Sequence, residues 1–184
     1  TFGINAFQFL YQNSRYVFLI FLCGYNMSFT QDKETDNYIT FQETWNLIKP
    51  YIPQNKKIWS PFYCDGKQKI FFKEMGFDII HNDEDFFKVT PEYDIVIDNP
   101  PFSKIKDILK KLKKLDKPFI LICPAYTFQY KFFQRPFGKH LQLIIPDKRL
   151  RFRHLTKTFK GGSLPNDCYF FCYKMNLHKD LIFL

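Results

Sequence analysis

Three features that mark other protein classes are missing from this sequence of 184 residues. The apolar run YVFLIFLC at 16–23 has eight residues, far fewer than the roughly 20 that a membrane-spanning helix requires. The five cysteines form neither a CxxC pair nor a Cys/His pattern suited to zinc. There is no internal repeat. We therefore expect no membrane partner, no metal and no repeat architecture, and we expect reduced thiols in an intracellular protein of the cytoplasm or nucleus.

The charges are unbalanced, because 27 Lys and Arg residues face 18 Asp and Glu residues. The net charge is +9 and the isoelectric point is about 9.2. Aromatic residues make up 20% of the chain, which favours packing and also stacking on flat ligands. A basic chain of this kind favours a polyanionic partner, nucleic acid before membrane. A solvated basic surface is the alternative.

The composition divides the chain into two parts. Residues 1–30 carry a single charge, Arg15, whereas the charged residues concentrate after that point. We expect 1–30 to be an apolar N-terminal extension that is not native to the domain or is loosely packed against it. Residues 31–184 are long enough to form one domain with its own core.

Strand and helix patterns alternate along 31–184. Helical spacing of apolar residues occurs at 40–49, 67–76 and 104–117, and Thr40 with Glu43 suits a capping box. Short apolar or β-branched runs suit strands at 58–59, 77–81, 93–98, 118–124, 141–146 and 167–174. Alternation of this kind predicts an α/β fold with a mainly parallel sheet and helices on both faces.

Two unusual loops follow strands of this predicted sheet, SPFYCDG at 60–66 and DNPPF at 98–102. Ligands of such sheets bind at the carboxyl ends of the strands, where both loops would lie. In the second loop Asn99 and Pro100 offer carbonyl acceptors, Pro101 stiffens the backbone and Phe102 offers a ring. Two fixed acceptors beside a ring suit the planar amine of a nucleobase that has been flipped or is single-stranded.

The order of these segments resembles a known family. DNPPF resembles the [DN]-P-P-[YFW] motif of the S-adenosylmethionine-dependent amino-methyltransferases, and IWSPFYCDG resembles their cofactor loop. DNYIT at 36–40 and DEDFF at 83–87 resemble two further cofactor segments. The combined order most resembles phage-like and protist DNA N6-adenine methyltransferases. This resemblance implies a Rossmann-like methyltransferase fold with an antiparallel late strand, trimmed because few residues separate 80 from 93.

The resemblance also implies roles for individual residues. Asn99, Pro100, Pro101 and Phe102 would hold the target amine and its base while S-adenosylmethionine provides the methyl group. The implied cofactor-binding residues are Tyr38, Thr40, Pro61, Phe62, Gly66, Asp83, Asp85 and Phe86, with Glu84 as an alternative to Asp83. The sequence departs from the family pattern at Ser60, Cys64 and Asp65, and a side chain at 64 stands where the backbone of a glycine would approach the cofactor.

The stretch DKRLRFRHLTKTFK at 147–160 is the strongest nucleic-acid candidate, because cations alternate with rings. Its cations are Lys148, Arg149, Arg151, Arg153, Lys157 and Lys160. The lysines of 104–117 are expected to form a solvated helix face. No separate target-recognition domain is evident, so a protein partner for recognition is possible. Adenine N6 methylation in DNA before RNA is the leading function; a protein glutamine-amide methyltransferase and a catalytically silent nucleic-acid-binding subunit remain alternatives.

Overall fold

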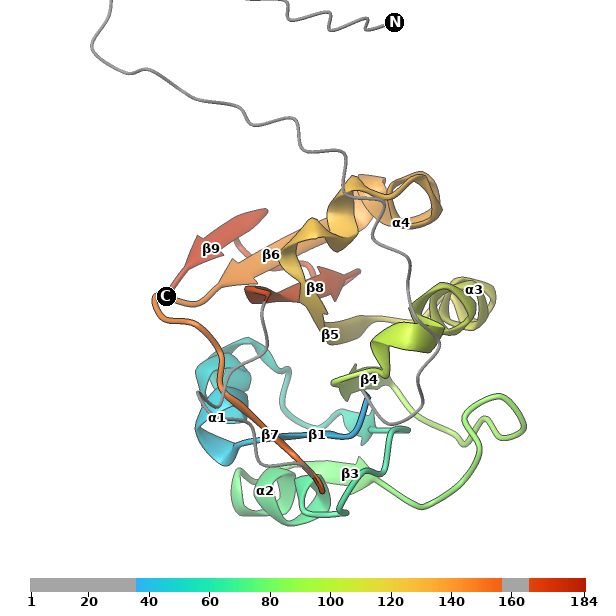
Figure 1. The fold of residues 1–184 in the computed structure, drawn as a ribbon, viewed down its shortest axis with the longest axis vertical. Coiled ribbons are helices and arrows are strands. Elements are labelled where there is room, and N and C mark those ends of the chain that lie inside the picture. The colour runs from blue at the N-terminus through green and yellow to red at the C-terminus, as the bar shows by residue number, and fades with distance from the viewer. Residues whose placement is uncertain (1–35, 157–165) are drawn as a thin grey trace, which may run out of the picture.

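The computed structural model describes residues 36–156 and 166–184, and its centre is a seven-stranded sheet (Figure 1). In spatial order the strands are β3 (Asp78–Ile80), β2 (Lys57–Trp59), β4 (Ile95–Asp98), β5 (Phe119–Pro124), β8 (Cys168–Tyr173), β6 (Leu141–Ile145) and β9 (Leu181–Phe183). Strand β8 runs antiparallel to β5 and β6, whereas every other pair in this sheet is parallel. The prediction of a mainly parallel sheet with an antiparallel late strand is confirmed, and the fold is Rossmann-like.

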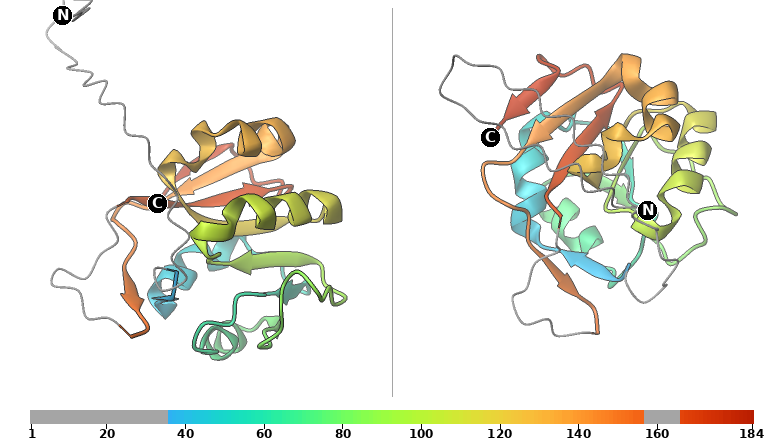
Figure 2. Two further views of the ribbon diagram at one scale, coloured as in Figure 1. Left: turned by 45° about the vertical axis from the view of Figure 1, so that its right-hand side comes forward. Right: turned by 45° about the horizontal axis from the view of Figure 1, so that its top comes forward.

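Helices cover both faces of this sheet (Figures 1 and 2). The α-helices of the described residues are α1 (Gln42–Ile48), α2 (Gln68–Glu74), α3 (Ile105–Leu115) and α4 (Lys131–Phe137). Four short 3-10 helices are η2 (Lys49–Tyr51), η3 (Phe102–Lys104), η4 (Ala125–Gln129) and η5 (Gly138–His140). A separate two-stranded ribbon pairs β1 (Tyr38–Thr40) with β7 (Phe152–His154).

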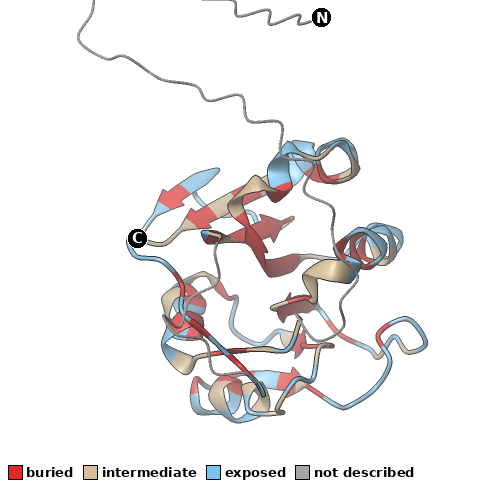
Figure 3. Cartoon of the chain, viewed as in Figure 1, coloured by how far each residue is buried: buried red, intermediate tan, exposed pale blue. Residues whose placement is uncertain are grey.

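Two hydrophobic cores follow from the alternation of side chains along the strands. Trp45 of α1 and Phe72 of α2 pack against one face, together with Ile97 and Ile120. Leu109 of α3 packs against the other face, in a cluster that also holds α4 and neighbouring side chains of the same strands. Figure 3 shows that the central strands are buried along their length. Burial on both faces explains why β4 and β5 read as unbroken apolar runs in the sequence.

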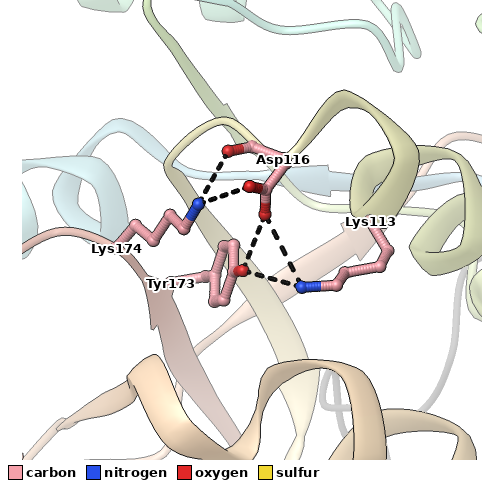
Figure 4. A network of polar contacts seen from close by, with 4 residues as sticks. All are labelled: Lys113, Asp116, Tyr173 and Lys174. Atoms are coloured by element: carbon pink, nitrogen blue, oxygen red, sulfur yellow. Dashed lines mark hydrogen bonds and ion pairs between the residues drawn. The ribbon is translucent and has the colours of Figure 1, made fainter.

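A polar network holds the far end of α3 to the sheet (Figure 4). Asp116 ends the helix in the left-handed conformation, and its carboxylate accepts hydrogen bonds from the Tyr173 hydroxyl at 2.9 Å and from Lys174 at 2.6 Å. These contacts and the nearby Lys113 ammonium lower the pKa of Asp116 to about 2. The side chains of Lys113 and Lys174 are therefore already paired with Asp116 and stabilise this end of α3.

Some local predictions need correction. Thr40 does not cap α1: the helix follows Phe41, which makes no side-chain capping bond, and Thr40 instead belongs to β1. Helix α4 and strands β1, β7 and β9 were not expected from the sequence. The trimmed connection is confirmed, because residues 81–94 contain no helix or strand between β3 and β4. In the described part of the chain no helix has both the length and the apolar character needed to cross a bilayer. The extension at 1–30 lies outside the described residues.

Candidate functional site

Three loops leave the sheet at the same edge, because β2, β3 and β4 are parallel neighbours. Ser60 follows β2, His81 follows β3, and Asp98 ends β4. Strand β1 lies over this edge and contributes Thr40. The loops SPFYCDG and DNPPF, which the sequence analysis expected at one edge, therefore do meet there.

Asn99 is the residue of this edge with the clearest unused bonding capacity. Its Nδ2 donates a hydrogen bond to Thr40 Oγ1 at 3.1 Å. Its Oδ1 is buried and has no hydrogen-bond partner among the described residues. Because a buried carbonyl oxygen without a donor is unfavourable, this atom is an acceptor that fits a ligand N–H.

Asp98 joins the two loops. It is fully buried, and it accepts hydrogen bonds from Phe62 N at 2.7 Å, from Ser60 Oγ at 3.0 Å and from Asn99 N at 2.7 Å. Burial raises the pKa of Asp98 to about 7, although all three hydrogen bonds oppose that rise. The carboxyl group thus fixes Phe62 and Asn99 relative to each other.

His81 extends this network into the loop after β3. Its Nδ1 lies 2.7 Å from the Ser60 carbonyl and 2.9 Å from Ser60 Oγ. The Ser60 hydroxyl proton is directed to Asp98 and the carbonyl can only accept, so Nδ1 carries the proton. Burial lowers the pKa of His81, which favours the neutral ring. Its Nε2 is buried without a partner in the described part of the chain.

The segment before α1 is attached to the DNPPF loop at two points. Asp36 accepts hydrogen bonds from the backbone N–H and the hydroxyl of Ser103. Thr40 accepts the bond from Asn99 described above. Tyr38, between them, packs against the core on the α1 side. Two segments about sixty residues apart in the sequence therefore form one wall of the site.

The loop after β2 has the shape of a tight turn. Pro61 is buried, and Gly66 N donates to Tyr63 O at 2.8 Å. Gly66 has a φ of +75°, and Cys64 has a φ of 48° although it is not glycine. A non-glycine residue in this region is strained by about 1–2 kcal/mol. Desolvation and the neighbouring Asp65 carboxylate raise the pKa of the Cys64 thiol to about 11, which favours the protonated thiol at neutral pH.

A small cavity lies where these walls meet, with a volume of about 20 Å³. It is lined by Tyr38, Ile39, Thr40, Phe62, Tyr63, Cys64, Asp65, Gln68, Asp98 and Asn99. Four of the residues singled out by the sequence are thus brought together: Tyr38, Thr40, Phe62 and Asn99. The volume suffices for about one water molecule, so a larger ligand requires a wall of the cavity to move.

The acidic residues of the segment 83–87 do not line this cavity. Asp83 and Asp85 are exposed. Asp85 accepts a hydrogen bond from Phe87 N at 2.9 Å and pairs with Lys88. Phe86 is buried against Trp59, with ring centroids 5.4 Å apart. The structure therefore gives Asp85 a turn-forming contact and Phe86 a core position.

The rest of the DNPPF loop is extended and leads directly into η3. Pro100 is buried and Pro101 is half-buried, and the Pro101 carbonyl accepts a hydrogen bond from Lys104 N at 3.1 Å. Phe102 is half-buried and packs against the core cluster on the α1 and α2 side.

The basic stretch at 147–160 lies partly beside this site. Arg149 is paired with Asp167 at 2.7 Å and Lys148 with Asp147 at 3.8 Å. Arg151 and Arg153 are exposed, and Arg153 is opposite Ile39 in the β1–β7 ribbon. The remaining predicted cations, Lys157 and Lys160, lie outside the described residues.

Comparisons with known proteins add little to this picture. No protein-family model matches the chain, and no curated protein matches it. Among solved structures the chain is similar to a "putative methyltransferase" from Thermoplasma acidophilum, with 12% sequence identity and a TM-score of 0.33. The match covers 70% of this chain and 60% of the other, which is less than two thirds of that protein. The assignment of the fold therefore rests on the strand order and directions themselves.

The sequence reasoning assigned no role to His81 and treated Asp98 as a neighbour of the motif. Both are polar residues at the carboxyl ends of strands that were themselves predicted. Aligning the ends of the three parallel strands would have placed Ser60, His81 and Asp98 at one edge. That alignment is the signal by which this network could have been found.

Proposed function

We propose that this chain transfers a methyl group from S-adenosylmethionine to the exocyclic N6 amine of adenine in nucleic acid, with DNA favoured over RNA. The observation that carries the proposal is the Oδ1 of Asn99, directly after β4, which is buried and has no hydrogen-bond partner among the residues that the structure describes. It stands beside Pro100, which has no N–H and presents only a carbonyl. A pair of fixed acceptors suits an –NH₂ donor.

The residues around the cavity fit the cofactor by their chemistry. Thr40 offers a hydroxyl, and the rings of Phe62 and Tyr63 suit a sulfonium cation. The carboxylate of Asp65, which pairs with Lys67 at 3.7 Å, would exchange that partner for the ammonium group of the cofactor. Bound S-adenosylmethionine supplies an electrophilic methyl group. Tyr38, Thr40, Phe62, Asp65 and the turn at Gly66 would hold it, after a wall of the cavity has moved.

The mechanism needs no covalent intermediate on the protein. Asn99 Oδ1 and the Pro100 carbonyl accept hydrogen bonds from the target amine, which orients its lone pair and keeps its electron density available. Phe102 stacks on the base once it turns from its half-buried position. Asp98 fixes the Asn99 backbone by its hydrogen bond to Asn99 N, and it acts as a positioning residue.

The test of this proposal is to replace Asn99, the residue whose side chain accepts the hydrogen bond from the target amine. We expect Asn99→Ala to lower transfer of labelled methyl groups to DNA by about a hundredfold or more, because an electrostatic acceptor at the reacting atom contributes about 3 kcal/mol. Binding of S-adenosylmethionine, measured by calorimetry, should stay within a few-fold of the parent. Asn46→Ala, at an exposed position of α1, is the matched control and should leave turnover unchanged.

Three outcomes separate the alternatives. Unchanged turnover in Asn99→Ala would reject the role of the DNPPF loop. Methyl transfer to a protein glutamine rather than to DNA or RNA would favour the glutamine-amide alternative. The absence of any S-adenosylmethionine binding by the parent chain would favour a catalytically silent subunit.

A further inference from the structure

A groove with a strongly basic wall begins next to the DNPPF loop and follows α3. The residues lining it are Phe87, Ser103, Lys104, Asp107, Lys110, Lys111, Lys114 and Leu115. Ser103 and Lys104 come directly after the NPPF turn, so one end of the groove adjoins the proposed target site. The lysines of this helix were expected to be a solvated face, yet part of that face lines a concave surface.

The lysines of α3 divide into two groups by what they contact. Lys111 donates hydrogen bonds to the backbone carbonyls of Phe86 and Val89, and Lys113 is bound to Tyr173 and Asp116 (Figure 4). Lys104, Lys110 and Lys114 are exposed, and their ammonium groups have no partner among the described residues. Among the described residues, the lining of the groove thus holds four lysines and one carboxylate, Asp107, and three of the lysines have free ammonium groups.

These three lysines are arranged as a track. Lys110 and Lys114 are one helical turn apart, and Lys104 lies near the start of α3, so the track is about 15 Å long at 1.5 Å per residue. The track contrasts with the 147–153 stretch, where Lys148 and Arg149 are already paired with carboxylates. Such a surface does not attract a positively charged cofactor, whereas it does attract a chain of phosphates.

Phe87 indicates which polyanion fits. Its side chain is 44% exposed at the groove, although the adjacent Phe86 is buried. An exposed ring beside cations suits unpaired bases, which stack on aromatic side chains, while duplex bases have no free face to offer. A single exposed ring is not the broad apolar face that a membrane-surface helix requires.

We propose that the groove between α3 and Phe87 binds the backbone of single-stranded nucleic acid and leads the strand to the DNPPF loop. Lys104, Lys110 and Lys114 contact successive phosphates, and Phe87 stacks on a base. This inference rests on the proposed function for the identity of the target, and it adds the path of the strand and its single-stranded state.

The test measures binding of the full chain to a fluorescently labelled single-stranded oligonucleotide by anisotropy over a range of salt concentrations. The variant Lys104→Gln/Lys110→Gln/Lys114→Gln should bind about tenfold more weakly or worse. The slope of log K against log salt should fall by about 2, since each single-strand phosphate contact contributes about 0.7. Phe87→Ala should weaken binding roughly tenfold with an unchanged salt slope.

The matched control is Lys49→Gln/Lys73→Gln/Lys139→Gln, which removes the same charge from three exposed lysines away from the groove. It should change affinity by less than about twofold. Equal losses in the two triple variants would overturn the proposal, because net charge alone would then explain binding. Tighter binding of a duplex of the same sequence, or of vesicles containing anionic lipid, would also overturn it. Thermal unfolding of each variant confirms that it is folded.

The outcome is independent of methyl transfer, because binding is measured without cofactor. If the parent chain methylates no nucleic acid while the groove variant still loses binding, the proposed function fails and the groove stands. If transfer is observed and the groove variant binds like the parent, the groove fails and the proposed function stands.

Discussion

Gly66 shows how one residue decides the shape of the loop after β2. Its φ of +75° lies in the left-handed region, which glycine adopts without strain. A Cβ at this position would also lie 2.7 Å from the Tyr63 hydroxyl oxygen. Cys64, two residues earlier, has a φ of 48° and keeps its side chain. The loop therefore tolerates a strained residue at 64 but has no room for a side chain at 66 while Tyr63 stays in place.

Gly66→Ala should lower the free energy of unfolding by about 1–2 kcal/mol, because alanine is strained at positive φ. Gly138→Ala is the matched control: Gly138 has an ordinary helical conformation, and a Cβ there would contact nothing within 4 Å. That variant should be neutral or more stable by up to about 1 kcal/mol. Urea unfolding of both variants checks the difference, and equal stability of the two would contradict this account of the loop.

At the scale of elements, the site is held together by contacts between strand ends. Asp98 at the end of β4 bonds to the backbone of the loop after β2, and Ser60 connects that loop to His81 after β3. Asp36 connects the segment before β1 to η3 through Ser103. Each loop is therefore positioned by a neighbouring element rather than by its own sequence.

Asp98→Ala should destabilise the protein by about 2–4 kcal/mol, because the part-buried N–H groups of Asn99 and Phe62 both lose their acceptor at about 1–3 kcal/mol each. The control is Asp94→Ala, just before the same strand, where an exposed carboxylate accepts one bond from Lys57 N. That change should have a much smaller effect. Chemical denaturation followed by circular dichroism measures both, and similar losses would show that Asp98 does not join the loops.

At the scale of the whole molecule, the candidate site lies between two hydrophobic cores. The sheet separates the α1 and α2 side from the α3 and α4 side, and the loops meet at its carboxyl edge. Burial of Asp98 at that edge raises the pKa of its carboxyl group from near 4 to about 7. A raised pKa of a buried acid means that folding favours its protonated form.

The stability that comes from protonation of Asp98 in the folded state should therefore be present below about pH 4 and be lost as the pH rises to about 7. Asp98→Asn removes this titration. The free energy of unfolding of the parent minus that of Asp98→Asn should fall between about pH 4 and about pH 7 and stay constant above that range. Urea unfolding of both proteins at several pH values measures this difference. The comparison also cancels the opposite contribution of His81, whose lowered pKa favours folding at higher pH. A difference that rises with pH would contradict the assignment.

Local patterns predicted most of the elements. The period of α3, the apolar runs of β4 and β5 and the glycine after α2 all match the structure. Helix α4 was missed because Pro136 lies within it. Strands β1, β7 and β9 were also missed, and each has only three residues, which gives little pattern, although β2 and β3 of the same length were predicted. In the candidate site, Asn99 with Thr40, Tyr38 and Phe62 was anticipated. His81 was not, since a single histidine has no periodic or spacing signal.

The sequence by itself determined the α/β class, the position of the DNPPF loop at a strand end and the rigidity of that loop, because these follow from side-chain periodicity and from the fixed φ of proline. Only the tertiary structure decided that Asp98 is buried with a raised pKa, that Asn99 Oδ1 lacks a donor within 36–156 and 166–184, and that Asp83 and Asp85 do not line the cavity. Burial and unmet hydrogen bonds depend on which strand ends become neighbours. That arrangement is set by the packing of distant segments and is not encoded in any one of them.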